Sequence, residues 1–262
     1  MTNSDKINTV RSLINGEILT EPFDHLVIDN FLPTDLANKL FDEFPDFEDS
    51  IWFEYSNSIE DKKLPSDWRK FPEHTYQLFS FLNSTLVLET VSTIFNTKLS
   101  SDHGLHGGGW HIHANGGKLN PHLDYSIHPT LKQQRKVNLI IYLCKDWKEE
   151  YGGHFGLYAQ EKDTLRAGNL IKEIPMGFNK AVLFDTTQQS WHGLSREVNC
   201  PGKVFRKSLA LYYLVDAPQG VDSRSRALFS PTADQIGDSS ILELISKRSD
   251  IKTATEVYIN KP

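Results

Sequence analysis

The chain has 262 residues, of which 39% are hydrophobic and 24% are charged, and its formal net charge is −6. This composition is typical of one globular domain large enough to bury a core. The acidic balance and the lack of a basic stripe argue against a nucleic-acid partner. We interpret Lys62-Lys63 and the lysines from Lys132 to Lys136 as solvated loop charge.

The sequence also argues against a membrane partner. No apolar stretch has the length that a membrane-spanning helix requires, and the N-terminus has no basic segment followed by an apolar one. Cys144 and Cys200 are too few for a disulfide framework. We therefore expect a cytoplasmic protein with reduced thiols, and the oligomeric state stays open.

The first elements alternate between strand and helix patterns. Residues 24–31 predict a β-strand. A helix is expected to follow, with Thr34 as its N-cap and Pro45 just beyond its end. Residues 46–70 are rich in aromatic and charged side chains and have no clean period.

A second helical pattern covers residues 74–96. Apolar residues recur there at helical spacing, and Leu86 belongs to the apolar stripe. We expect a break after Leu88 and a shorter helix beyond it.

Short β-like runs and glycines replace helical periodicity after residue 98. Glycine-containing turns separate the runs, and this arrangement is typical of a β-sandwich or barrel. The strand candidates are 109–114, 120–125, 136–144, 153–158, 170–174, 181–185 and 203–215. Residues 236–245 predict a short helix on the outside of the fold.

A His-x-Asp motif lies in one of these candidate strands. His122 and Asp124 stand two residues apart, and His192 follows far downstream. In an extended segment, residues i and i+2 point to the same side, so both side chains can face one ion. Two histidines and a carboxylate on one face of a metal are the ligand set of non-haem Fe(II) oxygenases. The short motif alone is weak evidence, because such strings also arise by chance.

A predicted strand over residues 203–215 carries an arginine toward the interior. Alternation puts Arg206, Ser208, Ala210 and Tyr212 on one face. An arginine on an inward face would carry an unpaired buried charge, at a cost on the order of several kcal/mol. A carboxylate ligand would satisfy it, because guanidinium groups bind carboxylates in a bidentate manner.

Taken together, these motifs resemble the Fe(II)- and 2-oxoglutarate-dependent dioxygenases, in particular the prolyl 4-hydroxylase-like branch. The signature elements present are His122-Leu123-Asp124, His192, Arg206-Lys207-Ser208, and the stretch from Arg135 to Trp147 followed by Gly152-Gly153. The similarity covers approximately residues 22–215. It is specific for the family and not for a substrate.

The resemblance implies a mainly β fold with flanking helices around a double-stranded β-helix core, a cupin-like jelly roll. We expect one structural domain in three parts. Residues 1–98 would supply a strand and helices packed on the core, residues 99–218 the catalytic core, and residues 219–262 a C-terminal extension.

The resemblance also implies the cofactors. Fe(II) would be held by His122, Asp124 and His192. The cosubstrates would be 2-oxoglutarate and O2, with ascorbate as a candidate reductant.

Further residues are implied for 2-oxoglutarate. Arg206 would pair with its distal carboxylate, and Ser208 and Tyr142 would add hydrogen bonds. Asn138 shares a strand face with Tyr142 and is a candidate for a position beside the ligands. His113 stands where many relatives have a tyrosine, so it either contacts the cosubstrate or is a surface or packing residue.

The other histidines receive no catalytic role. His25 and His74 are expected to be structural or exposed, and His128 and His154 to lie on the surface. The glycine- and histidine-rich stretch 103–113 is a candidate lid near the site.

The predicted activity is hydroxylation of an unactivated C–H bond in a small molecule, with release of succinate and CO2. Asp124 keeps the carboxylate that related halogenases lack, although desaturation or ring closure would use the same ligands. One alternative is a peptidyl, prolyl-type hydroxylase of the same family. Others are a non-oxygenase metal cupin, which would not need an inward arginine, and a non-catalytic module that keeps the fold.

Overall fold

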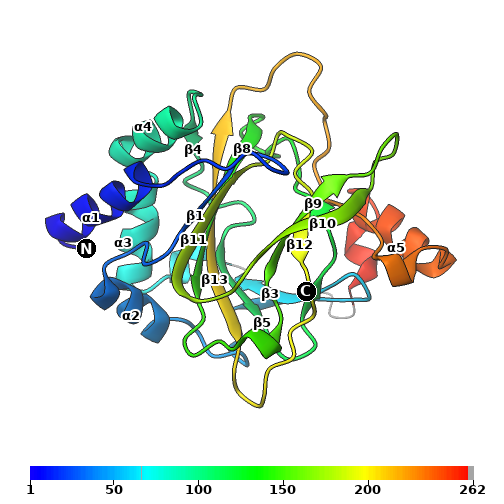
Figure 1. Ribbon diagram of the computed structural model, residues 1–262, viewed down its shortest axis with the longest axis horizontal. Coiled ribbons are helices and arrows are strands. Elements are labelled where there is room, and N and C mark those ends of the chain that lie inside the picture. The colour runs from blue at the N-terminus through cyan, green and yellow to red at the C-terminus, as the bar shows by residue number, and fades with distance from the viewer. Residues whose placement is uncertain (66, 259–262) are drawn as a thin grey trace.

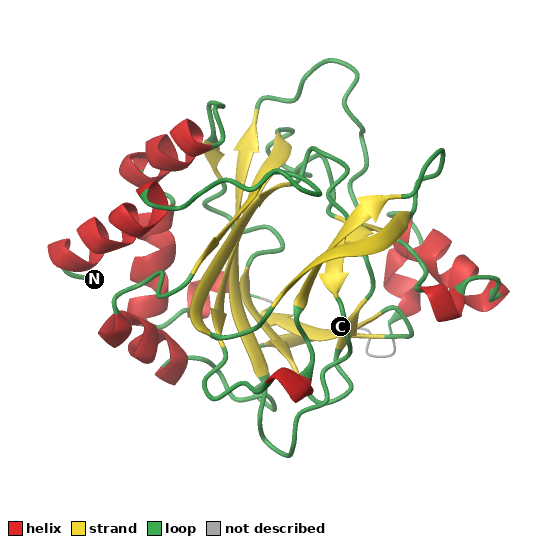
Figure 2. Cartoon of the chain, viewed as in Figure 1, coloured by secondary structure: helices red, strands yellow, loops and turns green. Residues whose placement is uncertain are grey.

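Two curled antiparallel β-sheets face each other in the computed structural model, which describes residues 1–65 and 67–258 (Figures 1 and 2). Helices cover the outer face of one sheet, and a C-terminal helix lies beside the other. The predicted mainly β fold with flanking helices is confirmed. Within the described residues, no helix is both long enough and apolar enough to span a bilayer.

The larger sheet takes strands from both halves of the chain. Its members are β1 (His25–Ile28), β2 (Trp52–Ser56), β3 (Glu60–Pro65), β4 (Ser100–Ser101), β5 (Gly109–His113), β6 (Lys118–Leu119), β8 (Gln134–Leu143), β11 (Phe178–Asp185) and β13 (Arg206–Val215). The order is β1-β11-β8-β13-β5-β3-β2, with β4 on β13 and β6 on β3. Strands from before and after residue 98 therefore share one sheet.

The smaller sheet completes the jelly roll. It contains β7 (His122–Leu123), β9 (Phe155–Gln160), β10 (Ala167–Ile174), β12 (His192–Leu194) and β14 (Leu228–Phe229). The order is β10-β9-β12-β7-β14. From β7 to β13 the chain passes back and forth between the two sheets, and only β9 and β10 follow each other within one sheet. This is the double-stranded β-helix that the sequence predicted.

The helices pack around this core. They are α1 (Asn3–Ile14), α2 (Thr34–Asp42), α3 (Glu73–Leu82), α4 (Thr85–Ile94) and α5 (Ser239–Ser249), with short 3-10 turns at η1 (Trp68–Lys70), η2 (Glu149–Tyr151), η3 (Ala233–Gln235) and η4 (Ala254–Val257). The sequence reading missed α1. Its signal is a capping box in which Thr2 Oγ1 accepts from the Asp5 N–H and Asp5 Oδ2 accepts from the Thr2 N–H.

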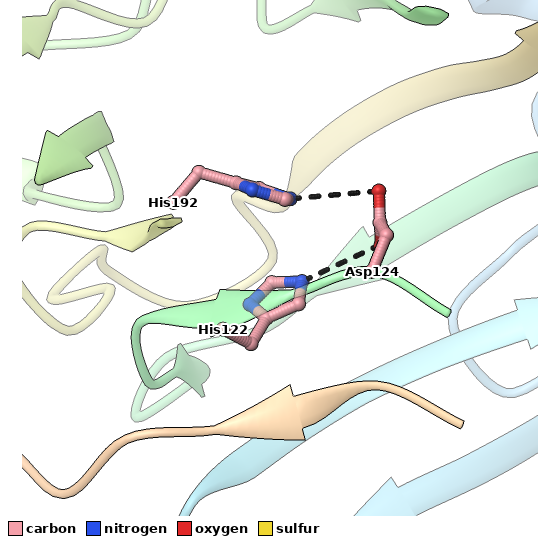
Figure 3. A group of neighbouring side chains, drawn as sticks. All are labelled: His122, Asp124 and His192. Carbon is pink, nitrogen blue, oxygen red and sulfur yellow. Dashed lines mark ion pairs between the residues drawn. The ribbon is translucent and has the colours of Figure 1, made fainter. Parts of the chain in front are cut away.

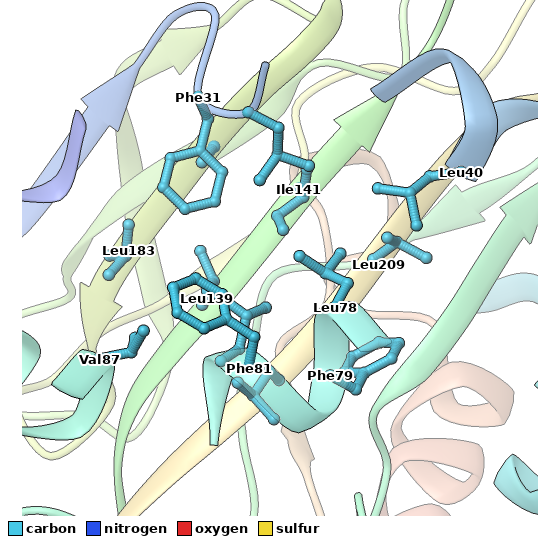
Figure 4. Close-up of a cluster of buried hydrophobic side chains, with 14 of the residues drawn as sticks. Phe31, Leu40, Leu78, Phe79, Phe81, Val87, Leu139, Ile141, Leu183 and Leu209 are labelled. Atoms are coloured by element: carbon cyan, nitrogen blue, oxygen red, sulfur yellow. The ribbon is translucent and has the colours of Figure 1, made fainter. Parts of the chain in front are cut away.

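The main core lies between the larger sheet and helices α2, α3 and α4 (Figure 4). Alternation along β8 sends Leu139 and Ile141 toward the helices, whereas Asn138, Ile140 and Tyr142 face the smaller sheet. Other residues of the core shown there are Phe31, Leu40, Leu78, Phe79, Phe81, Val87, Leu183 and Leu209. One face of the larger sheet is thus filled by packing, which leaves the other face for the site.

Two helix predictions need correction. Thr34 is the first residue of α2, and Pro33 is its N-cap. The break in the second helical segment falls at Asn83 and Ser84, because Ser84 is extended and begins α4 anew. As a result Leu86 faces solvent, with 51% of its surface exposed, and is not part of the apolar stripe.

Two strand predictions also differ from the structure. The segment 46–70 contains the β2–β3 hairpin, in which Glu54 pairs with Lys63 and Tyr55 with Lys62. The strand expected over residues 120–125 is only His122–Leu123 long. Asp124 therefore follows the strand and is not part of it.

We predict that Leu78→Ala destabilises the fold much more than Leu86→Ala. Leu78 is fully buried and Leu86 is half exposed on the next helix. Removing a buried leucine side chain costs about 2–5 kcal/mol, whereas a surface substitution changes stability by about 0.5 kcal/mol or less. Urea unfolding of both variants measures the difference. Equal losses would contradict the observed helix break.

Candidate metal centre

Two very short strands bring the predicted histidines together. His122 begins β7 and His192 begins β12, and the two residues are direct partners in the β7–β12 ladder. Their ring centroids lie 4.3 Å apart. Asp124 follows β7, and its two carboxylate oxygens each lie 3.8 Å from one imidazole Nε2 atom (Figure 3). One donor atom from each residue lies within 4.8 Å of the others, so the group could hold a metal ion.

Backbone carbonyls orient both imidazoles. His122 Nδ1 is 3.0 Å from the carbonyl oxygen of Asn120, and His192 Nδ1 is 2.8 Å from that of Ser190. A carbonyl oxygen only accepts hydrogen bonds, so each Nδ1 carries the proton and donates it. Each Nε2 therefore presents a lone pair toward Asp124. Metal-binding histidines are usually held in this manner.

Gly193 allows the two strands to approach closely. A Cβ atom built on Gly193 would lie 2.7 Å from the carbonyl oxygen of Leu119 and 2.8 Å from that of Asn120. These obstacles are backbone atoms that cannot swing away. Only glycine next to His192 therefore permits this spacing between β12 and the chain leading into β7.

Asp124 is fixed from several directions. Arg135 Nη1 lies 3.2 Å from Asp124 Oδ1, and the Arg135 guanidinium is sandwiched 3.5 Å from the ring centroid of Tyr125 and 3.2 Å from that of Tyr212. Asn138 Nδ2 is 3.4 Å from Asp124 Oδ2, which places this predicted neighbour beside the carboxylate. The stacked guanidinium cannot move without breaking contact with two rings.

The local electrostatics keep the three residues in their metal-binding protonation states. Burial, together with neighbouring His192, lowers the pKa of His122 to about 3. Burial also lowers the pKa of His192. Burial alone would raise the pKa of Asp124, but the Arg135 guanidinium and the two imidazoles lower it overall. Two neutral imidazoles and one carboxylate therefore face each other at neutral pH.

A second buried cation lies in the same cavity. Arg206 begins β13 and is 4% exposed. Its Nε donates to the carbonyl oxygen of Gly153 at 2.7 Å. Within residues 1–65 and 67–258, no carboxylate lies within ion-pair distance of its guanidinium. The sequence-based reasoning that this arginine faces inward without a charged partner agrees with the structure.

The residues predicted to act with Arg206 surround it. The guanidinium carbon is 5.0 Å from the ring centroid of Tyr142, whose buried hydroxyl has no hydrogen-bond partner in the described part of the chain. Ser208 is a direct ladder partner of Tyr142 and is 2% exposed. His113 is the partner of Arg206 on β5. It is not a surface residue: it is 2% exposed, and both of its ring nitrogens are buried without a partner among the described residues.

One cavity of about 230 Å³ is lined by the three candidate metal ligands and by His113, Arg206 and Ser208, whereas Tyr142 lies behind its wall. The inward face of β13 lines it as predicted, through Arg206, Ser208, Ala210 and Tyr212. The cavity walls also contain residues that the sequence reading did not assign to a site, namely Tyr55, Lys62, Arg226, Phe229 and Arg248. Lys62 was interpreted as solvated loop charge, and this is wrong, because its side chain is 12% exposed and borders the cavity.

The remaining histidines are mostly structural. His128 and His154, expected on the surface, are 5% and 1% exposed. Nδ1 of His128 accepts backbone N–H groups of its own turn, and Nδ1 of His154 accepts one from Met176. The stretch 103–113 does border the cavity, through His106, Gly107, His111 and His113.

Residues 108–214 match the 2OG-Fe(II) oxygenase superfamily. The match spans the strands that carry His122, His192 and Arg206, and also Asp124 just after β7. A comparison with curated protein sequences gave no match.

Solved prolyl hydroxylases have similar folds. A prolyl 4-hydroxylase of Phytophthora capsici aligns at 18% identity with a TM-score of 0.52, over 98% of this chain and 82% of that one. A Pseudomonas putida prolyl-4-hydroxylase aligns at 16% identity and a TM-score of 0.46, over 80% of this chain and 98% of that one. A Trichoplax adhaerens prolyl hydroxylase, solved with a hypoxia inducible factor peptide fragment, aligns at 17% identity and a TM-score of 0.46, over 80% of this chain and 88% of that one.

We predict that His122→Ala and Asp124→Ala each abolish metal binding. Loss of a ligand should reduce affinity by more than the roughly 10–100-fold that is typical of losing an outer hydrogen-bond partner. Anaerobic calorimetric titration with Fe(II) measures the affinity. His103→Ala is the matched control, because His103 is exposed and does not border this cavity. Unchanged affinity in both ligand variants would contradict the assignment.

We also predict that metal binding at neutral pH releases almost no protons. His122 and His192 have lowered pKa values and are already neutral, and Asp124 is already ionised. Protons then compete with the metal only as the pH falls toward these lowered values, so affinity should change little between about pH 7 and pH 8. Calorimetry in buffers of different ionisation enthalpy counts the protons. Release of close to one proton per metal would show that a ligand is protonated beforehand.

Proposed function

We propose that this chain, whose residues 108–214 match the 2OG-Fe(II) oxygenase superfamily, is a member of that superfamily, binds Fe(II) through His122, Asp124 and His192 and hydroxylates a small molecule. As a 2-oxoglutarate-dependent dioxygenase it uses Fe(II), 2-oxoglutarate and O2. The superfamily match supports this function over that of a non-oxygenase cupin.

The observation that carries this proposal is that one cavity contains both a group of side chains able to bind a metal and a buried arginine able to bind a carboxylate. The two imidazoles turn Nε2 lone pairs toward one carboxylate, and nearby Arg206 is a buried cation with no carboxylate partner among residues 1–65 and 67–258. A dicarboxylate cosubstrate supplies the missing negative charge. We assign its distal carboxylate to Arg206, with Ser208 and Tyr142 as hydrogen-bond donors.

The protein residues bind, orient and exclude water. Arg206 positions 2-oxoglutarate as a charged anchor, and the buried hydroxyl of Tyr142 stays protonated because burial raises its pKa. Arg135, fixed between two tyrosine rings, holds the carboxylate of Asp124 in place. His113 is neutral because burial and Arg206 lower its pKa, so it can contact the cosubstrate without adding charge. When bound, Fe(II) activates O2 for oxidation of a C–H bond while 2-oxoglutarate becomes succinate and CO2.

The walls of the cavity support a small-molecule substrate. The hairpin residue Tyr55 on one side and Arg248 of α5 on another border the same space of about 230 Å³ as the histidines. Such a space accommodates one compact group more readily than an extended chain. A peptidyl substrate is the alternative, and its support is the fold shared with the Phytophthora capsici prolyl 4-hydroxylase.

We predict that Arg206→Ala weakens 2-oxoglutarate binding while Fe(II) binding persists. Truncating one partner of a buried charge pair costs about 2–5 kcal/mol, which is a loss of roughly thirtyfold or more in affinity. Charge-transfer absorption of the anaerobic Fe(II)–2-oxoglutarate complex reports this binding. Arg196→Ala is the matched control, because Arg196 forms an exposed ion pair with Glu173.

Succinate release, screened over small metabolites and proline-containing peptides, then tests the substrate class. Stimulation by small molecules supports the proposal, and stimulation by peptides alone replaces it with the peptidyl alternative. Failure of the wild-type protein to bind 2-oxoglutarate would overturn the proposed function itself.

A further inference from the structure

Three further cations line the cavity besides Arg135 and Arg206. Lys62 comes from β3, Arg226 from the segment before β14, and Arg248 from α5. These three elements lie outside the strands that carry the metal-binding residues (Figure 1). We call Lys62, Arg226 and Arg248 the substrate-side cations.

The sheet register separates this cluster from the 2-oxoglutarate site. Arg206 pairs with His113 on β5, and Lys63 of β3 pairs with Ile112 of β5. Lys62, the neighbour of Lys63, therefore faces the same side of the sheet as Arg206 but stands two strands away, which is about 10 Å between backbones. His111 and His113 lie between them on β5. Arg206 and Lys62 therefore enter the cavity from different strands.

Lys62 is held at the cavity wall by a shared carboxylate. Its Nζ lies 3.4 Å from Glu60 Oε2 and 5.5 Å from the ring centroid of Tyr55. The same Glu60 is fully buried and also pairs with Arg248, whose Nε is 2.6 Å from Oε1. The hydroxyl of Tyr258 donates to that oxygen at 2.8 Å. Glu60 carries one negative charge, so it cannot fully neutralise both Lys62 and Arg248.

Arg248 and Arg226 retain unused hydrogen-bonding capacity. Arg248 is 7% exposed, yet its Nη1 is buried without a partner among the described residues. Arg226 has no carboxylate within ion-pair distance in that same part of the chain, whereas its neighbour Arg224 pairs with Asp222 at 2.6 Å. Arg226 is only partly buried. A fully buried donor such as Arg248 Nη1 normally has a partner, so the lack of one among the described residues points to a ligand.

Charge counting leads to the same conclusion. Five cations line the cavity, namely Lys62, Arg135, Arg206, Arg226 and Arg248, and Asp124 is the only carboxylate among the described lining residues. Glu60 behind the wall brings the negative charges to two. Fe(II) and the 2-oxoglutarate dianion cancel each other, so the loaded site keeps three uncompensated positive charges. Such a cavity favours an anionic molecule strongly over a neutral one.

We propose that the substrate carries a carboxylate or phosphate group, and that Lys62, Arg226 and Arg248 bind this group while the rest of the molecule extends toward the metal. This inference rests on the proposed function, because it takes Arg206 to be occupied by 2-oxoglutarate. It narrows the substrate class from any small molecule to an organic anion.

The test compares three probes of the same shape. Benzoate, phenyl phosphate and benzamide share one aromatic ring, and only the first two are anions. Their dissociation constants are measured by ligand-observed NMR on the full chain loaded with Zn(II) and saturating 2-oxoglutarate, which fills the site without turnover. We expect at least one anion to bind at least tenfold more tightly than benzamide. The better anion identifies carboxylate or phosphate as the preferred group.

Substitutions of individual cations test where in the cavity the anionic probe binds. Lys62→Met and Arg226→Gln should each weaken the better anion about tenfold and leave benzamide unchanged. Lys63→Met is the matched control, because Lys63 is the next residue on the same strand, faces the opposite side, and donates from Nζ to the carbonyl oxygen of Phe47. The Lys63→Met variant should bind all three probes with the same affinity as the wild type.

Several results would overturn the proposal. Benzamide could bind as tightly as both anions, or anion affinity could be unchanged in Lys62→Met and Arg226→Gln. Displacement of the anion by further 2-oxoglutarate would show that it sits at Arg206. The charge-transfer absorption of the Fe(II)–2-oxoglutarate complex is recorded for every variant, so loss of the proposed function is distinguished from loss of the anion site.

Discussion

The ladder pairing of β7 with β12 is the contact from which the rest of the site follows. It sets His122 directly opposite His192, although the two residues are seventy positions apart in the chain. Each strand is only two or three residues long, so the pairing depends on the larger framework that holds it. Gly193 permits the close approach, and backbone carbonyls at Asn120 and Ser190 turn the rings. The geometry of the three donor atoms is therefore built mainly from backbone interactions.

The positively charged side chains of the cavity are its second organising feature, and they differ in the partners that they contact. Arg135 is neutralised by Asp124 and clamped by aromatic rings, so its role is positioning. Arg206 is buried, donates to the carbonyl oxygen of Gly153 and has no carboxylate partner within the described part of the chain, so we assign it to the cosubstrate. Lys62 and Arg248 share one carboxylate between them. The same cavity thus separates cations that hold the protein together from cations with capacity for ligands.

Local patterns predicted much of the scaffold. Long alternating strands such as β8, β11 and β13 were anticipated because their residues bury both faces or carry a clear period of two. The inward face of β13, with Arg206 and Ser208, followed from that period alone. The resemblance to the oxygenase family then identified the residues that converge at the candidate metal centre.

The sequence did not predict the β2–β3 hairpin, the buried position of Lys62 or the break between α3 and α4, and each has a physical reason. The β2–β3 hairpin has charged residues on both faces, and its strand character comes from pairing with β5, a contact distant in sequence. Lys62 and Lys63 look alike in a list of residues, but the pleat sends one into the cavity and the other outward. The break between α3 and α4 depends on Ser84 leaving helical geometry, which competes with a continuous apolar pattern across it.

Different elements form the candidate metal centre and the outer wall of the cavity, and this separation affects how new substrate specificities would arise in this fold. The strands that carry His122 and His192, with Asp124 directly after one of them, also form the jelly roll, so this part of the chain tolerates little change. The hairpin, the segment before β14 and α5 contribute only the outer wall, and α5 is joined to the hairpin through Glu60 and Arg248. Replacing these peripheral elements would change which substrate the cavity accepts and would leave the candidate metal-binding residues unchanged. Evolution or engineering of new specificities would therefore act at the periphery, with the Glu60–Arg248 pair exchanged as one unit.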